Sequence, residues 1–388
     1  MKKLHIINLE KMGGVERLFI QYINDFSDYS DDVICISDSI DTEIRRCIPD
    51  QKIIIANRFF NKIPLKMPQF LRKYALQKRV NTSEAEVIIV WDLIPRLITK
   101  PEGVKLVYYD HGSSWRYPQN LKTHSFMAML DGVISASCAS RRVMEQRFKL
   151  ACPHYVVINR IRAPEGVVTR PRRLGNTLWL GTASRQVSLK GISVALLMMQ
   201  ELISRGHPAG LEIAGKGPDR DTFIALAEKL HIMDYVTFSG FQQDMSPFFN
   251  RIDIYISTPV TEPFGLSCME ALYHGVPVIF PLIDGQPEVI KQETCGIGLI
   301  PTVTIDQHRI LSGIQVDFPW KVYDPVTDKM AEPNLLSHLA CADAIETMLQ
   351  SDTYDMLSDN AKFYSANNFN YNKFKIDFEY SLMSIMDM

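Results

Sequence analysis

One stretch decides the fold: TLWLGTASRQVSLKGISVALLMMQELISRGHPAGLEIA, residues 177–214. It opens with an apolar run at Thr177–Leu180 and closes with another at Leu211–Ala214. Between them, Val194–Leu202 has apolar residues at the three- and four-residue spacing of a helix that buries one face. A strand, a helix and a strand in this order are typical of a βαβ unit, whose two strands are parallel.

The same alternation runs along most of the chain. A first series of apolar runs precedes residue 160: Leu4–Asn8, Val33–Ser37, Lys52–Ala56, Val87–Trp91, Lys105–Tyr109, Gly132–Ser135 and Tyr155–Ile158. A second series follows it: Thr177–Leu180, Leu211–Ala214, Val236–Phe238, Ile254–Ser257, Val278–Phe280 and Gly296–Ile300. Most runs lack polar alternation, which is typical of strands buried on both faces of a parallel sheet. The sequence therefore predicts a doubly wound α/β fold.

The two series are separated by residues 160–176, which hold two prolines, two glycines and five arginines without apolar periodicity. This composition predicts an interdomain linker. With about 150 residues per domain, a chain of 388 residues is expected to form two domains. We expect two Rossmann-like domains facing across a cleft, with ligands at the carboxyl ends of the strands.

Composition excludes several classes of protein. An apolar fraction of 46% with 22% charged residues is that of an ordinary globular protein. A net charge of −2 disfavours a nucleic-acid-binding protein. The seven cysteines form no CxxC pair, which predicts buried thiols in a reducing compartment. No apolar run approaches the roughly 18 residues that span a bilayer, so we expect a cytoplasmic protein.

The segment TPVTEPFGLSCMEAL, residues 258–272, is the most informative in the chain. A strand is predicted to end near Ser257 and a helix to begin at about Leu266, which presents free N–H groups to an anion. Glu262 precedes this helix and Glu270 lies about a turn into it, so both can reach one cleft. Carboxylates there suit the hydroxyl groups of ribose or of a sugar. Two solvated glutamates around a turn are the alternative.

Three other loops follow predicted strands. Arg185 and Lys190 lie in a strand–helix loop, where two cations suit a diphosphate, although a solvated loop is the alternative. Gly13 and Gly14 follow the first strand and allow close approach of a ligand, but they do not form the GxGxxG dinucleotide motif. His111 ends another strand and points toward the cleft; a core or surface histidine is the alternative.

Together these pieces resemble the family 4 retaining glycosyltransferases of GT-B fold. The resemblance rests on motifs found in the same order: Gly13-Gly14, His111-Gly112, Arg185 with Lys190-Gly191, Gly215-Lys216-Gly217-Pro218, and Glu262 with Glu270. It implies an N-terminal acceptor-binding domain at 1–165 and a nucleotide-sugar-binding domain at 172–364. It also implies that a C-terminal helix, at about 365–388, packs back on the first domain.

The resemblance implies roles for individual residues. Four would be catalytic: Arg185, Lys190, Glu262 and His111. Eight would bind the donor: Gly13, Gly14, Gly215, Phe241, Phe264, Gly265, Leu266 and Glu270. The donor would be a UDP- or GDP-linked sugar, and no metal would be needed because cations and a helix N-terminus neutralise the diphosphate. This chain has Ser184-Arg185 where the family commonly has Gly-Arg.

The expected function is therefore transfer of a sugar, with retention of configuration, to a glycan or lipid-linked acceptor in cell-surface polysaccharide or glycolipid synthesis. A nucleotide-sugar 2-epimerase of GT-B fold and a non-catalytic GT-B partner subunit are the alternatives. Residues 301–334 replace what is usually a short connection, and we interpret them as a surface excursion.

The stretch from Gln51 to Ser83 has eight cations and no acid. Aromatic and aliphatic residues are interleaved with these cations, a pattern that suits an anionic membrane surface. We therefore expect a peripheral protein on the inner face of the membrane. A solvated basic face whose aromatic side chains lie in the core is the alternative, and an anionic glycan acceptor would also explain the charge.

Overall fold

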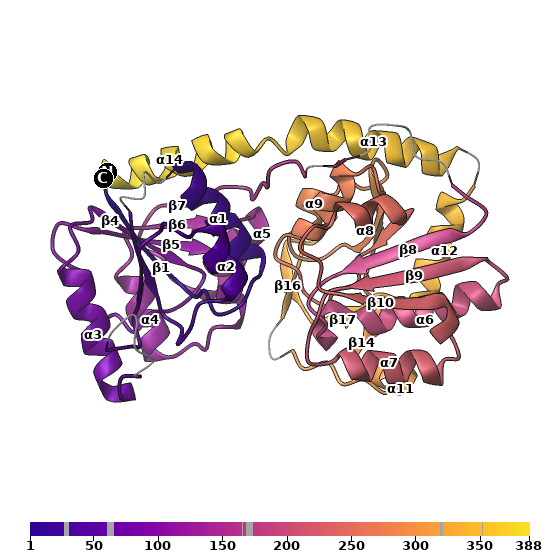
Figure 1. The fold of residues 1–388 in the computed structure, drawn as a ribbon, viewed down its shortest axis with the longest axis horizontal. Coiled ribbons are helices and arrows are strands. Elements are labelled where there is room, and N and C mark those ends of the chain that lie inside the picture. The colour runs from indigo at the N-terminus through magenta and orange to yellow at the C-terminus, as the bar shows by residue number, and fades with distance from the viewer. Residues whose placement is uncertain (27–30, 60–65, 165, 168–173, 319–320, 351) are drawn as a thin grey trace. The chain divides into compact units, whose positions relative to one another are not determined.

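The computed structural model describes residues 1–26, 31–59, 66–164, 166–167, 174–318, 321–350 and 352–388. They form two compact units (Figure 1): residues 1–161 with 372–388, and residues 162–371. The predicted domains run from 1 to 165, with the final helix at about 365–388, and from 172 to 364. Residues 165 and 168–173 of the expected linker lie outside the described residues.

A parallel sheet forms the centre of the first unit. Its strand order is β3-β2-β1-β4-β5-β6-β7, and every pairing is parallel. The strands are β1 (Lys3–Ile7), β2 (Asp32–Cys35), β3 (Ile53–Ile55), β4 (Val87–Trp91), β5 (Lys105–Asp110), β6 (Gly132–Ser135) and β7 (His154–Val156). Strands β2 and β3 are added on one side of β1 and strands β4 to β7 on the other, so the strand order reverses between β1 and β4. Ligands bind at this kind of switch point in doubly wound folds.

Helices flank this sheet, as Figure 1 shows. They are α1 (Gly14–Phe26), α2 (Thr42–Cys47), α3 (Gln69–Asn81), α4 (Leu121–Ala128), α5 (Cys138–Arg147) and α14 (Tyr371–Met386), with a 3₁₀ turn at Ser113–Arg116. Asn120 and Ser137 begin α4 and α5 by accepting hydrogen bonds from backbone N–H groups. The final helix α14 is tied to the sheet and to α1, because Glu379 pairs with Lys3 at 2.8 Å and accepts from the Tyr22 hydroxyl at 2.9 Å.

The second unit has its own parallel sheet, with strand order β10-β9-β8-β11-β12-β13. Its strands are β8 (Leu178–Ala183), β9 (Ala209–Ala214), β10 (Val236–Gly240), β11 (Ile254–Ile256), β12 (Val278–Pro281) and β13 (Gly296–Leu299). The flanking helices are α6 (Ile192–Ser204), α7 (Arg220–Lys229), α8 (Ser246–Arg251), α9 (Leu266–Tyr273), α10 (Gln286–Val289), α12 (His338–Met348) and α13 (Thr353–Asn368). Here the switch point lies between β8 and β11.

The expected surface excursion at 301–334 is instead built into the second unit. It contains α11 (Ile305–Ser312), a short pairing of β14 (Val303–Thr304) with β17 (Asn334–Leu335), and a hairpin of β15 (Val322–Asp324) and β16 (Lys329–Ala331). Ile314 and Val316 are buried in the core, and buried His308 bonds to the Ser193 hydroxyl of α6 at 2.7 Å. The interpretation as a surface excursion is therefore wrong.

The doubly wound α/β prediction is confirmed, and each predicted strand is present, most of them with shifted ends. The expectation that the cysteines are buried is wrong at Cys47 and Cys138, which are exposed. Cys47 is the last residue of α2 and Cys138 the first residue of α5, and the ends of these helices reach the surface. Within the described ranges, no helix is long and apolar enough to cross a membrane.

Candidate active site

The switch point of the second unit brings two predicted loops together. Because β8 and β11 are neighbours, the loop after β8 and the loop after β11 leave the same edge of the sheet side by side. Lys190 in the first loop pairs with Glu262 in the second, with its Nζ atom 2.6 Å from Oε2. Arg185 lies exposed in the same loop as Lys190. The structure therefore gathers three of the four expected catalytic residues at one edge.

Gly191 allows these two loops to touch. Its φ of +65° is in the left-handed region, and a Cβ atom there would overlap the carbonyl oxygen of Thr258. The Thr258 hydroxyl donates to the Gly191 carbonyl at 2.8 Å, and the Val260 N–H donates to the Leu189 carbonyl at 2.9 Å. Any larger residue at position 191 would separate Lys190 from Glu262.

The loop after β9 lies on the other side of the Arg185 loop. Gly215 has a φ of +114°, and a Cβ atom on it would overlap the Ser184 carbonyl oxygen. The Gln186 N–H donates to the Lys216 carbonyl at 3.0 Å, which ties the two loops together. Lys216 in turn lies 4.9 Å from the centre of the exposed Phe241 ring, just after β10. Gly215 and Phe241 thus lie at the same edge of the sheet as Arg185.

The helix α9 begins at this edge as well. Gly265 is its N-terminal cap in a left-handed conformation, with a φ of +104°, and no side chain among the described residues caps the helix. Phe264 is buried beneath this turn, whereas Leu266 and Glu270 are half-buried. An uncapped helix N-terminus carries N–H groups and a positive dipole end that favour an anion.

Sequence reasoning missed Asp284, which holds the Glu262 loop in place. This buried carboxylate accepts hydrogen bonds from the Thr261 hydroxyl, the Glu262 N–H and the Tyr323 N–H, each at 2.8 Å. Its own N–H donates to the Tyr323 carbonyl at 2.8 Å, so the β15–β16 hairpin supports the loop. Burial raises the pKa of Asp284 to about 7. An Asp-Gly pair after the β12 run signals a turn, but no local signal shows what the carboxylate contacts.

The first unit carries the remaining expected residues at the carboxyl edge of its own sheet. Gly13 and Gly14 follow β1 and begin α1, and His111 follows β5. The loop of His111 is held by Asp92, a residue that sequence reasoning also missed. Asp92 accepts from the His111 N–H at 2.7 Å and from the Ser113 hydroxyl at 2.6 Å.

The environment of His111 keeps its imidazole neutral. Burial lowers its pKa to about 3. Nδ1 lies 3.2 Å from the Asn159 side-chain nitrogen, and buried Nε2 has no hydrogen-bond partner among the described residues. If Asn159 donates to Nδ1, the proton sits on Nε2.

No set of three or more His, Cys, Asp or Glu side chains in the described part of the chain could hold a metal ion. The buried thiol of Cys268 in α9 is not a candidate nucleophile, because burial raises its pKa to about 12.

Comparison with known proteins identifies the architecture. Residues 175–309 match the family model for glycosyl transferases group 1. The crystal structure of HepE from Anabaena in complex with UDP-glucose resembles this chain with a TM-score of 0.75 at 16% identity, covering 99% of this chain and 100% of that one. The chain has the GT-B fold.

Two glycosyltransferases match different lengths of this chain. An uncharacterised glycosyltransferase of Methanocaldococcus jannaschii is 34% identical over 114 residues, which make up 29% of each protein. LpsD of Rhizobium meliloti, a lipopolysaccharide core biosynthesis glycosyltransferase, is 23% identical over 306 residues, or 76% of this chain and 82% of LpsD. The chain spans less than a third of the length of the first relative.

Proposed function

We propose that this chain is a retaining glycosyltransferase that moves a sugar from a nucleoside diphosphate, UDP or GDP, to a glycan or lipid-linked acceptor. The observation that carries the proposal is the Lys190–Glu262 pair beside Arg185 at the switch point. A cation pair suits a diphosphate, and an adjacent carboxylate suits sugar hydroxyls. The UDP-glucose bound to HepE and the lipopolysaccharide role in the name of LpsD support a nucleotide-sugar donor and a cell-surface product.

Each group then has a defined task in the reaction. The acceptor hydroxyl oxygen forms a bond to C1 of the donor sugar, the bond from C1 to the β-phosphate oxygen breaks, and the acceptor proton passes to the departing phosphate. Arg185 and Lys190 neutralise the charge that develops on that phosphate, with the N-terminus of α9 beside them. Glu262 accepts from donor-sugar hydroxyls, and Glu270 accepts from ribose hydroxyls. The residues in this scheme supply positive charge without a metal ion.

In this proposal the first unit binds the acceptor. Gly13 and Gly14 leave room for a ligand to approach the backbone of this unit closely. The neutral imidazole of His111 donates from Nε2 to a sugar hydroxyl. The 2-epimerase alternative, which needs no acceptor, is not favoured, since the relatives are glycosyltransferases.

The alanine variants of the two cations test the proposal. We expect Arg185→Ala and Lys190→Ala each to lower the transfer rate by roughly 10²–10³, because each removes one group that stabilises the leaving diphosphate. Lys229→Ala, which removes an exposed cation at the end of α7, should leave the rate unchanged. Transfer is measured as nucleoside diphosphate release that depends on added acceptor. Near-normal rates in a folded Arg185→Ala or Lys190→Ala variant would contradict the donor-site assignment.

The donor base can be identified before the acceptor is known. A ligand at 100 times its Kd stabilises the folded protein by about 2.7 kcal/mol, which is readily seen in thermal unfolding. We expect either the UDP-sugars or the GDP-sugars to stabilise the folded protein in this screen, and the other series not to. Stabilisation by neither series would contradict the proposed donor class.

The helix α3 supports a peripheral membrane location on the cytoplasmic side. Its outward face carries Phe70, Lys73, Tyr74 and Lys78, and the side chains of Phe70 and Tyr74 are 69% and 57% exposed. The aromatic residues that the structure describes on this face are therefore not in the core. Phe60, Lys62, Ile63 and Leu65 of the same basic stretch lie outside the described residues.

A further inference from the structure

The first unit contains a cavity of about 220 Å³ that is lined by none of the residues named in the proposed reaction. It lies past the carboxyl ends of β2, β3 and β4, with Ile36, Ala56 and Ile94 among its lining residues. Leu76 of α3 adds a further apolar side chain. The cavity therefore opens at the same edge of the sheet as Gly13, Gly14 and His111. It is smaller than the roughly 300–1,000 Å³ typical of pockets for drug-sized ligands.

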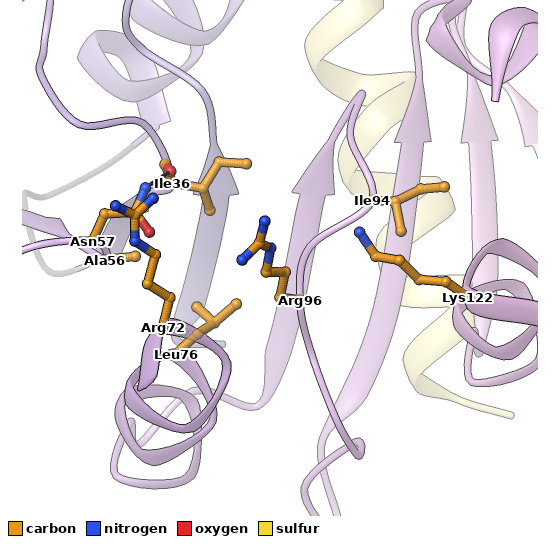
Figure 2. Close-up of a pocket in the computed structure, with 8 residues that line it drawn as sticks. All are labelled: Ile36, Ala56, Asn57, Arg72, Leu76, Ile94, Arg96 and Lys122. Carbon is orange, nitrogen blue, oxygen red and sulfur yellow. Dashed lines mark hydrogen bonds between the residues drawn. The ribbon is translucent and has the colours of Figure 1, made fainter. Parts of the chain in front are cut away.

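Three cations line this cavity, and none of its lining residues is acidic. Arg72 comes from α3, Arg96 from the segment after β4, and Lys122 from the first turn of α4. Figure 2 shows Arg96 between Arg72 and Lys122, with the three side chains entering from separate elements. A solvated basic helix would spread its cations outward along one element, whereas these converge on one concavity.

The charge of the three cations is only partly compensated. Asp38 lies 3.8 Å from the Arg72 guanidinium, but it also pairs with Lys66 at 2.8 Å, which lowers the pKa of this carboxyl. Within the described ranges, neither Arg96 nor Lys122 has a carboxylate within ion-pair distance. Three like charges around an apolar floor repel one another, and an anion relieves this repulsion.

The guanidinium of Arg72 is already oriented. Its Nε atom donates to the Met67 carbonyl at 3.0 Å, which fixes the plane of the group. A fixed guanidinium fork suits the two oxygens of a phosphate or carboxylate. The hydroxyls of a neutral sugar could form hydrogen bonds to these cations, but they carry no charge to balance the three positive charges.

We infer that this cavity binds an anionic group, a phosphate or a carboxylate, carried on the acceptor sugar. This inference rests on the proposed function, which assigns acceptor binding to the first unit. It accounts for the basic character of α3 by two distinct uses of one helix: Arg72 faces the cavity, while Lys73 and Lys78 lie on the outer face.

Calorimetric titration of the full chain with three sugars tests the inference. Glucose 6-phosphate carries a phosphate, glucuronate carries a carboxylate, and glucose carries neither. We expect at least one anionic sugar to bind more tightly than glucose, and the Arg96→Gln/Lys122→Gln variant to weaken that binding by about tenfold or more, since hydrogen bonds to charged groups are the stronger ones. Arg96→Lys keeps the positive charge without the planar guanidinium, so it should weaken binding of the anionic sugar less than the double variant does.

The matched control is Lys149→Gln. Lys149 is exposed between α5 and β7, at the opposite edge of the sheet, and its loss should leave the affinity for the anionic sugar unchanged. The inference is overturned if neither anionic sugar binds better than glucose, or if the double variant binds it as the unaltered chain does. UDP and GDP titrated separately report on the proposed function. If UDP or GDP binds but neither anionic sugar does, the inference fails and the proposed function is unaffected. If an anionic sugar binds but neither nucleotide does, the cavity is an anion site and the proposed donor is wrong.

Discussion

At the scale of single residues, two buried aspartates position the loops that carry the expected catalytic groups. Asp92 follows β4 and holds the loop of His111, while Asp284 follows β12 and holds the loop of Glu262. Both have left-handed backbones, with φ values of 53° and 51°, and each reaches from one strand end to the loop of the neighbouring strand. Neither is expected to touch substrate, so both are positioning residues.

We expect Asp284→Asn to lower turnover by about tenfold or more, because an amide nitrogen would face one of the three donors and displace Glu262. Transfer kinetics measure this, and we expect no matching loss in affinity for the free nucleoside diphosphate. A folded variant with unchanged turnover would show that Asp284 does not position Glu262.

The same variant has a pH signature. Burial raises the pKa of Asp284 to about 7, so the folded chain holds this proton more tightly than the unfolded chain. The contribution to stability is present below the unfolded pKa of about 4 and is lost as the pH rises through the folded value. The free energy of unfolding of the unaltered chain, relative to Asp284→Asn, should therefore fall between about pH 4 and 7, by a few kcal/mol. Urea unfolding across that range measures it, and a constant difference would contradict the assignment.

At the scale of elements, glycines decide how closely neighbouring loops can pack. Gly191 and Gly206 both have positive φ values, +65° and +85°, but only Gly191 has backbone atoms where a Cβ atom would lie. This pair separates the cost of the left-handed backbone from the cost of steric overlap.

We expect Gly206→Ala to lower the free energy of unfolding by about 1 kcal/mol, the cost of the left-handed backbone. Gly191→Ala should lower the free energy of unfolding by about 1–3 kcal/mol more than Gly206→Ala does, because Thr258 must move. It should also weaken binding of the nucleoside diphosphate, since Lys190 moves with the loop. Thermal unfolding and calorimetry measure the two effects, and equal losses in both variants would show that the loops do not need this contact.

At the scale of the whole molecule, the proposed reaction depends on cations of the chain itself. We expect transfer to continue in excess EDTA, because Arg185, Lys190 and the start of α9 supply the charge that a divalent ion would otherwise supply. Complete loss of activity that Mg²⁺ or Mn²⁺ restores would contradict this mechanism.

Membrane attachment is also a property of the whole molecule. We expect the chain to float with anionic vesicles at low salt and to detach at high salt, as electrostatic binding requires. Lys73→Gln/Lys78→Gln should weaken binding by about 2 kcal/mol, at roughly 1 kcal/mol per cation. Lys229→Gln, an exposed cation of the second unit, is the control. Absence from both anionic and neutral vesicles would contradict the membrane proposal without affecting the transferase proposal.

The helices and strands could be predicted from the sequence, because each leaves a local pattern of apolar residues in the chain. Apolar runs at β4 and β6 match the predicted bounds, and the loops with Arg185, Lys190 and Glu262 follow strands as expected. The insert at 301–334 was misjudged, since its short strands and its buried residues, among them His308, lack such a pattern.

Which of these loops and side chains lie together could not be predicted from the sequence and follows from the arrangement of the strands. Lys190 and Glu262 are 72 positions apart and come together because β8 and β11 are neighbours in the sheet. Asp284 bonds to Tyr323 of the insert, and Arg72, Arg96 and Lys122 share a cavity although three separate elements carry them. Local periodicity reports which face of an element is buried, but strand order and the backbone turns after each strand decide which side chains become partners.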